Sequence, residues 1–137
     1  MDNSTQVTIP FYHQGASAGL GAFTDDAPVS EMIALPAPLL GRSGSALFAV
    51  PAKGDSMEPL IRDGSLLVAE RIQTPHEGIY VLARNDLLFV KRIQPREPGI
   101  LRVISENPAY DSEDVRLDYP HQSLRILGRV IWIGHTI

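Results

Sequence analysis

The sequence predicts a mostly β fold, built as a sandwich or a partly open barrel of short antiparallel strands. Three observations lead to this expectation. Short runs of β-branched and aliphatic residues recur along the chain, turn-forming Gly, Pro, Asn and Asp separate them, and helical periodicity is weak. Chains with many short strands and frequent turn signals commonly fold as sandwiches or barrels. With 137 residues, 44% of them apolar, the chain can bury one substantial core.

The first 27 residues are predicted to form a flexible arm ahead of a domain over 28–137. Residues 1–9 are polar and are interpreted as a loose lead-in, followed by a short extended piece over 9–12. The stretch 14–23 is rich in small residues and carries no charge. Its composition fits a plain linker as well as a segment that must enter a narrow site.

The domain is expected to begin with a strand over 31–35 and a helical turn over 36–41 that ends at a glycine. Further strands are predicted from apolar runs bounded by turns, at 46–50, 65–70, 79–83, 87–94, 100–105, 114–117 and 124–134. Arg84-Asn85-Asp86 should join two of them as a tight hairpin. The last strand is long and apolar, so as an open edge it would be prone to aggregation.

Composition and charge exclude several classes of function. The chain has no cysteine and its four histidines lack ligand spacing, so we expect no disulfide, no metal and no other cofactor. The net charge is −4 without clustered Lys and Arg, so this chain is not expected to grip DNA itself. No apolar stretch is long enough to span a membrane and no signal-peptide pattern is present, which predicts a cytoplasmic protein.

A candidate nucleophile lies in the segment Gly54-Asp55-Ser56-Met57-Glu58-Pro59. Its glycine permits unusual backbone angles, and Asp55 or Ser56 can cap a short helical turn over 57–61. The backbone amides of Ser56 and Met57 would be unpaired at such a helix start. They could therefore stabilise the oxyanion of an acyl-transfer intermediate.

A candidate base lies in the apolar run 87–93. Strand alternation places Lys91 on the same face as Phe89 and Ile93. A serine hydroxyl needs an adjacent base, and lysine can act as one only when it is neutral. Burial lowers the lysine pKa from its ordinary value of about 10.4. Taken singly, however, a Gly-Asp-Ser sequence is usually an ordinary turn, and a strand lysine usually points to water.

The combination of segments is more specific than either one. Together they resemble the C-terminal domain of the LexA-type self-cleaving proteins, which include lambda-type phage repressors, the SOS repressor and the UmuD mutagenesis proteins. The resemblance covers nearly the whole chain. Its most specific parts are Gly54-Asp55-Ser56-Met57-Glu58-Pro59, Ile61-Arg62-Asp63-Gly64-Ser65-Leu66-Leu67-Val68 and Phe89-Val90-Lys91-Arg92-Ile93.

The resemblance implies a serine endopeptidase with a Ser–Lys dyad, in which Ser56 is the nucleophile and Lys91 the general base. The family cuts between a small residue and glycine, which points to Ala18-Gly19 as the cleavage site in the arm. It also implies a homodimer through the C-terminal strands and a RecA–ssDNA filament, formed on DNA damage, as co-protease. DNA would be bound only through an N-terminal helix-turn-helix domain that this chain lacks, and cleavage would separate that domain from the dimer.

Two alternatives to a phage-type repressor remain at this stage. One is a UmuD-like accessory subunit of a translesion polymerase, and the other is a dimerisation module with little or no cleavage. Bacterial signal peptidases use a similar dyad, but they are membrane-anchored. The segment Asn107-Pro108-Ala109-Tyr110 resembles the family's Asn-Pro-x-Tyr and is interpreted as structural. We assign turn, solubility and packing roles to the charged residues near the motif, Asp55, Glu58, Asp63 and Arg92.

Overall fold

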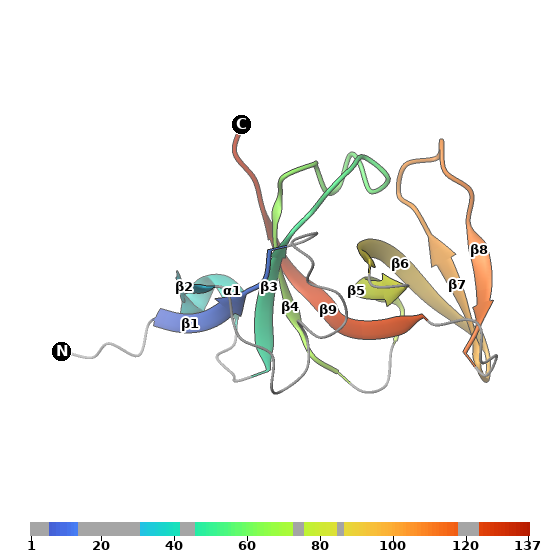
Figure 1. Cartoon of the computed structure of the whole chain (residues 1–137), viewed down its shortest axis with the longest axis horizontal. Helices are drawn as coiled ribbons and strands as arrows, with labels where there is room; N and C mark the ends of the chain where they lie inside the picture. Colours follow the sequence, from blue (N-terminus) through green and yellow to red (C-terminus); the bar gives the residue numbers. More distant parts are fainter. Residues whose placement is uncertain (1–5, 14–30, 42–45, 73–75, 85–86, 118–123) are drawn as a thin grey trace.

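The computed structural model describes residues 6–13, 31–41, 46–72, 76–84, 87–117 and 124–137. Strands dominate this part of the chain, with one short helix, α1 (Ala37–Leu40) (Figure 1). The strands are β1 (Gln6–Phe11), β2 (Glu31–Pro36), β3 (Leu47–Pro51), β4 (Leu66–Glu70), β5 (Gly78–Arg84), β6 (Leu87–Glu97), β7 (Ile100–Ile104), β8 (Glu113–Arg116) and β9 (Arg125–Gly134). The prediction of a mostly β fold is confirmed.

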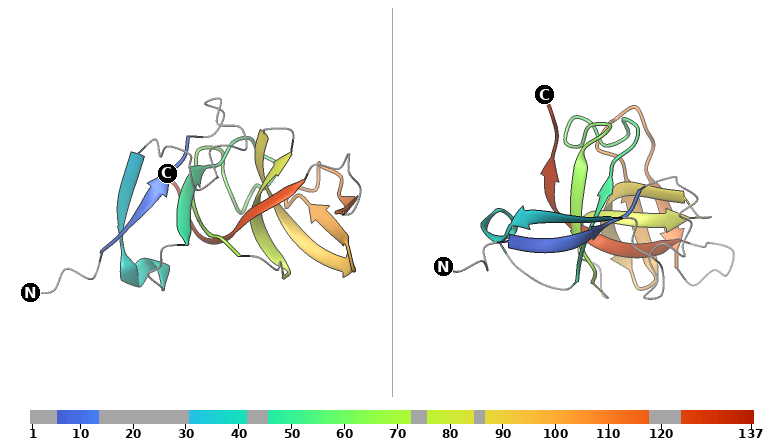
Figure 2. Two further views of the ribbon diagram at one scale, coloured as in Figure 1. Left: turned by 60° about the horizontal axis from the view of Figure 1, so that its bottom comes forward. Right: turned by 60° about the vertical axis from the view of Figure 1, so that its left-hand side comes forward.

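The described strands form one open sheet in the order β2-β1-β3-β4-β9-β5-β6-β7-β8. All neighbouring strands are antiparallel except β1 and β3, which are parallel. The sheet is strongly twisted, so β1 and β2 lie at one end of the molecule and β7 and β8 at the other (Figures 1 and 2). The predicted hairpin is consistent with the register, because Arg84 of β5 pairs with Leu87 of β6.

Residues 6–9 belong to the sheet, and the interpretation of 1–9 as a loose lead-in was wrong for them. Val7 and Ile9 are buried, with 7% and 1% of their surface exposed, while Gln6 and Thr8 face solvent. This alternation is what a strand with one covered face requires. β1 pairs with β2 along its whole length and contacts β3 through the pair Phe11 and Ala49.

The final strand is in the interior of the sheet. β9 pairs with β4 through its second half and with β5 through its first half, so β2 and β8 are the outermost strands of the described sheet. Gly128 lies where the register with β5 shifts, and a Cβ atom there would come within 2.6 Å of the Phe48 ring. A glycine is therefore needed for β9 to pass this close to the core.

Three apolar clusters support the sheet. The first includes Phe48, Met57 and Ile61, and the second includes Tyr80 and Ile93. The third packs β1, β2 and α1 against β3 and β4. The predicted helical turn is confirmed as α1, where the Gly41 amide donates to the Ala37 carbonyl over 3.1 Å at a φ of 71°. No helix in these residue ranges has the length and hydropathy needed to span a bilayer.

Candidate active site

Ser56 lies in the loop that connects β3 to β4. The Gly54 amide donates to the Asp63 carboxylate over 2.6 Å at a φ of 83°, a conformation that favours glycine. Hydrogen-bonded turns follow Ser56, so the turn expected over 57–61 is present but does not continue into a helix. One of these turns is closed by the Ile61 amide, which donates to the Met57 carbonyl over 2.9 Å.

The loop is anchored to the core immediately after Ser56. Met57 and Ile61 are almost fully buried in the first cluster, while Ser56 itself is half-buried. The base of the loop is closed by two backbone hydrogen bonds, from the Ala52 amide to the Ser65 carbonyl over 2.8 Å and from the Gly64 amide back to Ala52 over 2.9 Å. The position of Ser56 is therefore set by the packing of Met57 and Ile61 and by the hydrogen bonds at the base of the loop.

Lys91 is carried by β6, opposite Tyr80 of β5. Phe89 and Ile93, its neighbours on the same strand face, pack in the second cluster. The Lys91 amine lies 2.7 Å from the Ser56 hydroxyl oxygen and 2.9 Å from that of Ser105. The fold thus brings together the two residues proposed from the sequence, although 35 positions separate them.

The burial of Lys91 favours its neutral amine, whereas the groups near the amine favour the ammonium form. Burial lowers the pKa of Lys91 below its ordinary value, and the charge of Glu113 on β8 raises it in part. The amine also lies 5.7 Å from the centre of the Tyr110 ring, a contact that favours the ammonium form. Desolvation is the larger of the two effects on the pKa, so Lys91 loses its proton more readily than an exposed lysine.

The segment after β7 holds the Ser56 loop in place. The Asn107 side-chain amide donates to the Asp55 carbonyl over 3.0 Å, and the Asn107 backbone amide donates to the Ser56 carbonyl, also over 3.0 Å. The Tyr110 hydroxyl donates to the Asp55 carboxylate, which raises the pKa of Tyr110. The structural role expected of Asn107-Pro108-Ala109-Tyr110 therefore consists of bonds to the residue that precedes Ser56 and to Ser56 itself.

The sequence does not predict two contacts of the site, that of the Ser105 hydroxyl with the Lys91 amine and that of the Asp55 carboxylate with the Tyr110 hydroxyl. Ser105 is predicted only as part of the strand 100–105, and Asp55 is assigned turn, solubility and packing roles. Ser105 carries no motif or spacing that distinguishes it from other serines. Its one sequence signal is its position at the end of a strand predicted near the lysine strand.

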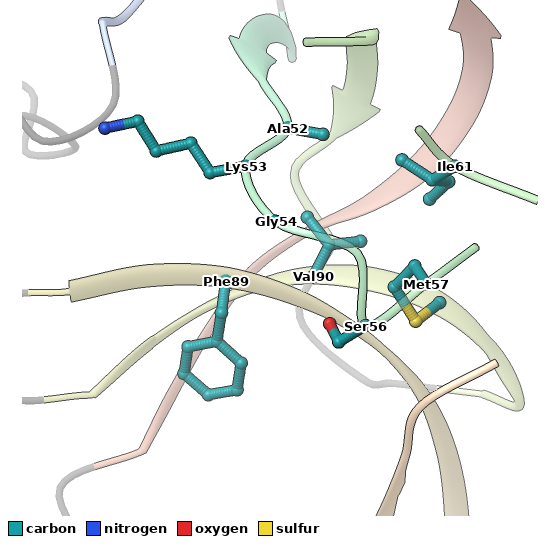
Figure 3. Close-up of a pocket in the computed structure, with 8 residues that line it drawn as sticks. All are labelled: Ala52, Lys53, Gly54, Ser56, Met57, Ile61, Phe89 and Val90. Atoms are coloured by element: carbon teal, nitrogen blue, oxygen red, sulfur yellow. The ribbon is translucent and has the colours of Figure 1, made fainter. Parts of the chain in front are cut away.

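A small pocket of about 30 Å³ opens beside Ser56. In Figure 3 Val90 and Phe89 point to opposite sides of β6, and the Lys53 side chain points away from Ser56. Its lining combines polar and apolar groups and comprises Ala52, Lys53, Gly54, Ser56, Met57, Ile61, Phe89 and Val90.

Other predicted features are only partly covered by the described residues. Ala18 and Gly19 lie outside them. The amides of Ser56 and Met57 donate to no backbone carbonyl within the described part of the chain. Among the same residues, no three His, Asp or Glu side chains gather closely enough to hold a metal ion.

Several known proteins are similar in sequence to part of this chain. The repressor protein CI of Enterobacteria phage phi80 is 30% identical over 91 residues, and the LexA repressors of Shewanella sp. (strain MR-7) and Shewanella baltica are 33% and 32% identical over 91 residues. Each match covers 65% of this chain but only 37% of the CI protein and 43% of the LexA proteins. The chain thus corresponds to less than half of these relatives. A family model described as Peptidase S24-like matches residues 10–131. The resemblance to the LexA-type repressors is thereby confirmed, and the chain belongs to the Peptidase S24-like family.

Proposed function

We propose that this chain is the self-cleaving peptidase domain of a phage-type repressor, in which Ser56 and Lys91 cut a peptide bond of the same chain. The observation that carries the proposal is the 2.7 Å contact between the Lys91 amine and the Ser56 hydroxyl. Because burial lowers the pKa of this lysine, a larger fraction of it is neutral near physiological pH. A neutral amine in contact with a hydroxyl is the arrangement that general-base activation requires.

The reaction begins when the neutral Lys91 amine takes the hydroxyl proton of Ser56. The Ser56 oxygen attacks the carbonyl carbon of the scissile bond, and the resulting oxyanion accepts hydrogen bonds from the amides of Ser56 and Met57. The C–N bond breaks as the Lys91 ammonium returns its proton to the leaving amine. Water, deprotonated by the same lysine, then attacks the acyl-enzyme, releases the new carboxylate and restores the serine.

The proposed scissile bond is Ala18-Gly19. A small residue on the carbonyl side can enter the small pocket beside Ser56. In the sequence the bond lies between β1 and β2, and these strands are paired from Phe11 and Glu31 onward. Because bond and site belong to one chain, the effective concentration of substrate is high.

The biological setting is proposed from the family. Relatives named CI repressor and LexA repressor suggest that this domain belongs to a repressor that binds DNA through a separate N-terminal helix-turn-helix domain. We propose that a RecA–ssDNA filament stimulates cleavage and that the C-terminal strands mediate homodimerisation. In support of the dimer, the part of β9 that follows Arg129 pairs only with β4 among the described strands, which leaves its other edge available.

The proposal is tested by incubating the purified chain at alkaline pH beside its Ser56→Ala and Lys91→Ala variants. We expect two fragments, 1–18 and 19–137, from the parent alone, detected by mass spectrometry. Loss of a positioned base should slow cutting by about 10²–10⁴-fold. Arg96→Ala, which removes an exposed cation from the same strand as Lys91, is the matched control. Cutting by Ser56→Ala, or no cutting by the parent up to pH 10, would contradict the proposal.

A further inference from the structure

Lys91 has a second hydroxyl partner, Ser105, which lies directly after β7. Ser105 is one of the few buried polar residues in the described chain, with 9% of its surface exposed. Its hydroxyl oxygen accepts a hydrogen bond from the Lys91 amine over 2.9 Å, while the Ser56 oxygen lies 2.7 Å from the same nitrogen. The amine is thus in contact with two serine hydroxyls from two different loops.

A neutral amine must be correctly oriented to act as a base, and a second hydroxyl can supply that orientation. Such an amine has two N–H bonds and a single electron pair, and it acts as a base only if that pair points at the proton to be removed. Lysine carries its amine on a flexible four-carbon stem, so burial alone does not fix this direction. We propose that Ser105 is a positioning residue that accepts one N–H of Lys91 and thereby directs the amine electron pair at the Ser56 hydroxyl. This inference rests on the proposed function, in which Lys91 is the base.

Ser105 is itself held firmly on both sides. Before it, Ile104 pairs with Arg92 of β6. After it, Glu106 accepts a hydrogen bond from the Arg92 side chain over 2.6 Å, and its backbone amide lies 3.4 Å from the Met57 sulfur. Asn107 then donates to the Ser56 carbonyl. One short segment therefore contacts the lysine strand and the serine loop together, and it fixes the Ser105 oxygen relative to both.

The groups around the Lys91 amine predict how loss of the Ser105 hydroxyl would change the pH profile of cleavage. Glu113 of β8 and the Tyr110 ring favour the charged amine, and Glu113 is itself paired with Arg84 over 3.2 Å. Ser105 also favours the charged form, because an ammonium donates a stronger hydrogen bond than an amine. Removing the Ser105 hydroxyl should therefore move the pH midpoint of cleavage downward. It should also lower the rate on the alkaline plateau, where the amine is already neutral and only its direction matters.

The experiment measures self-cleavage rate against pH for the parent chain and for Ser105→Ala, Ser105→Cys and Ser105→Thr. We expect Ser105→Ala to lower the plateau rate about ten- to a hundredfold, the scale of a small misplacement of a catalytic group. Cysteine preserves the size of serine but is a weak acceptor, so it should behave like alanine. Threonine keeps the hydroxyl and should stay close to the parent. Ser112→Ala, at an exposed serine, is the matched control.

A second measurement does not depend on cutting of the arm. A fluorophosphonate reacts with an activated serine: the Ser56 oxygen bonds to phosphorus, fluoride leaves, and the Lys91 amine takes the proton. The rate of labelling, followed as the increase in intact protein mass, should rank the variants in the same order as the cleavage rate. Circular dichroism confirms that each variant is folded. Equal rates in Ser105→Ala and the parent in both assays would overturn the positioning role. Absence of cleavage with labelling that still depends on Ser105 would overturn self-cleavage and leave the positioning role supported.

Discussion

The two ends of the sheet contribute different things to the proposed reaction. The part of the sheet that runs from β3 through β4, β9 and β5 to β6 carries the serine loop and the lysine, and its contacts link segments that are far apart in the sequence, as with Ser56 and Lys91. The hairpin of β1 and β2 lies at one end of the sheet (Figure 2). Its buried residues Val7 and Ile9 pack with Leu40 against β3 and β4, in a cluster separate from the one that contains Met57. Its outer strand, β2, has no buried residue.

The proposed catalytic pair and the proposed substrate bond therefore depend on different parts of the sheet. The serine and the lysine are already in contact, held by buried residues on both sides. The proposed substrate bond follows β1 in the sequence, so its delivery depends on the hairpin end of the sheet instead. Variants near Ser56 and Lys91 should therefore change the cleavage rate, whereas variants in β1 should change whether the two fragments stay associated after cleavage.

The largest expected effect in the catalytic half is that of pH. Burial lowers the pKa of Lys91, but below that pKa most of the lysine is still protonated. The cleavage rate should therefore rise about tenfold per pH unit from neutral pH, then level off below about pH 10.4, the value for an exposed lysine. Gel densitometry of timed samples between pH 6 and 10.5 measures this curve. A rate that stays flat from pH 7 to 10 would contradict Lys91 as the base.

The same titration predicts a change in stability. The folded state releases the Lys91 proton at a lower pH than the unfolded chain does, so within that window the unfolded state binds more protons. Stability of the Ser56→Ala chain, which cannot cut itself, should consequently rise with pH from the depressed pKa up to about 10.4. Lys91→Met should lose this dependence in urea unfolding. The effect should be small, because Lys91 is only partly buried.

The next expected effect is that the two fragments stay associated through the hairpin of β1 and β2. If the chain is cut at Ala18-Gly19, β1 keeps its pairing with β2, and the Tyr12 amide keeps its 3.0 Å bond to the Ala49 carbonyl. We therefore expect fragments 1–18 and 19–137 to elute together from a sizing column in native buffer and to separate in urea. This would revise the expectation that cleavage by itself separates the two parts of a repressor.

A charge in the hairpin core should break that association. Ile9 is 1% exposed, so Ile9→Asp would bury an unpaired carboxylate at a cost of several kcal/mol. The cut variant should release fragment 1–18, whereas Thr8→Asp, on the exposed face of the same strand, should retain it. Release of the fragment from the parent chain would show that strand pairing does not hold it.

The sequence was most informative where local signals and long-range contacts agreed. The runs that became β3 to β7 and β9 alternate with clear turn signals, and the family motifs around Ser56 and Lys91 identified the two residues that meet. The prediction was weakest for β1, although residues 6–9 alternate polar and apolar and Val7 and Ile9 are the buried pair. This alternation covers only four residues and directly follows the mostly polar residues 1–5, so it is a weak signal until the partner strands β2 and β3 are known.

The contacts that tune the site were also beyond sequence reasoning. The Ser105 contact depends on where the end of β7 lies relative to β6, which no spacing in the sequence specifies. The turn expected after Ser56 forms but does not continue into a helix, and buried Met57 and Ile61 hold it against the core. Motifs thus pointed to the two residues that meet, and tertiary packing determined their further partners.

The smallest expected effect comes from the one acidic residue whose charge raises the pKa of Lys91. Glu113→Gln removes that charge, so the pKa of Lys91 should fall further and the cleavage curve should move to lower pH with its plateau unchanged. Because the Glu113 side chain is 53% exposed and paired with Arg84, the gain near pH 7.5 should be only about two- to threefold and should diminish with salt. Asp114→Asn, on the same strand and bonded to Arg102, is the matched control and should leave the curve in place. A lower plateau in Glu113→Gln would mean that this carboxylate helps to orient the site, in which case the chemical half of the molecule would extend to β8.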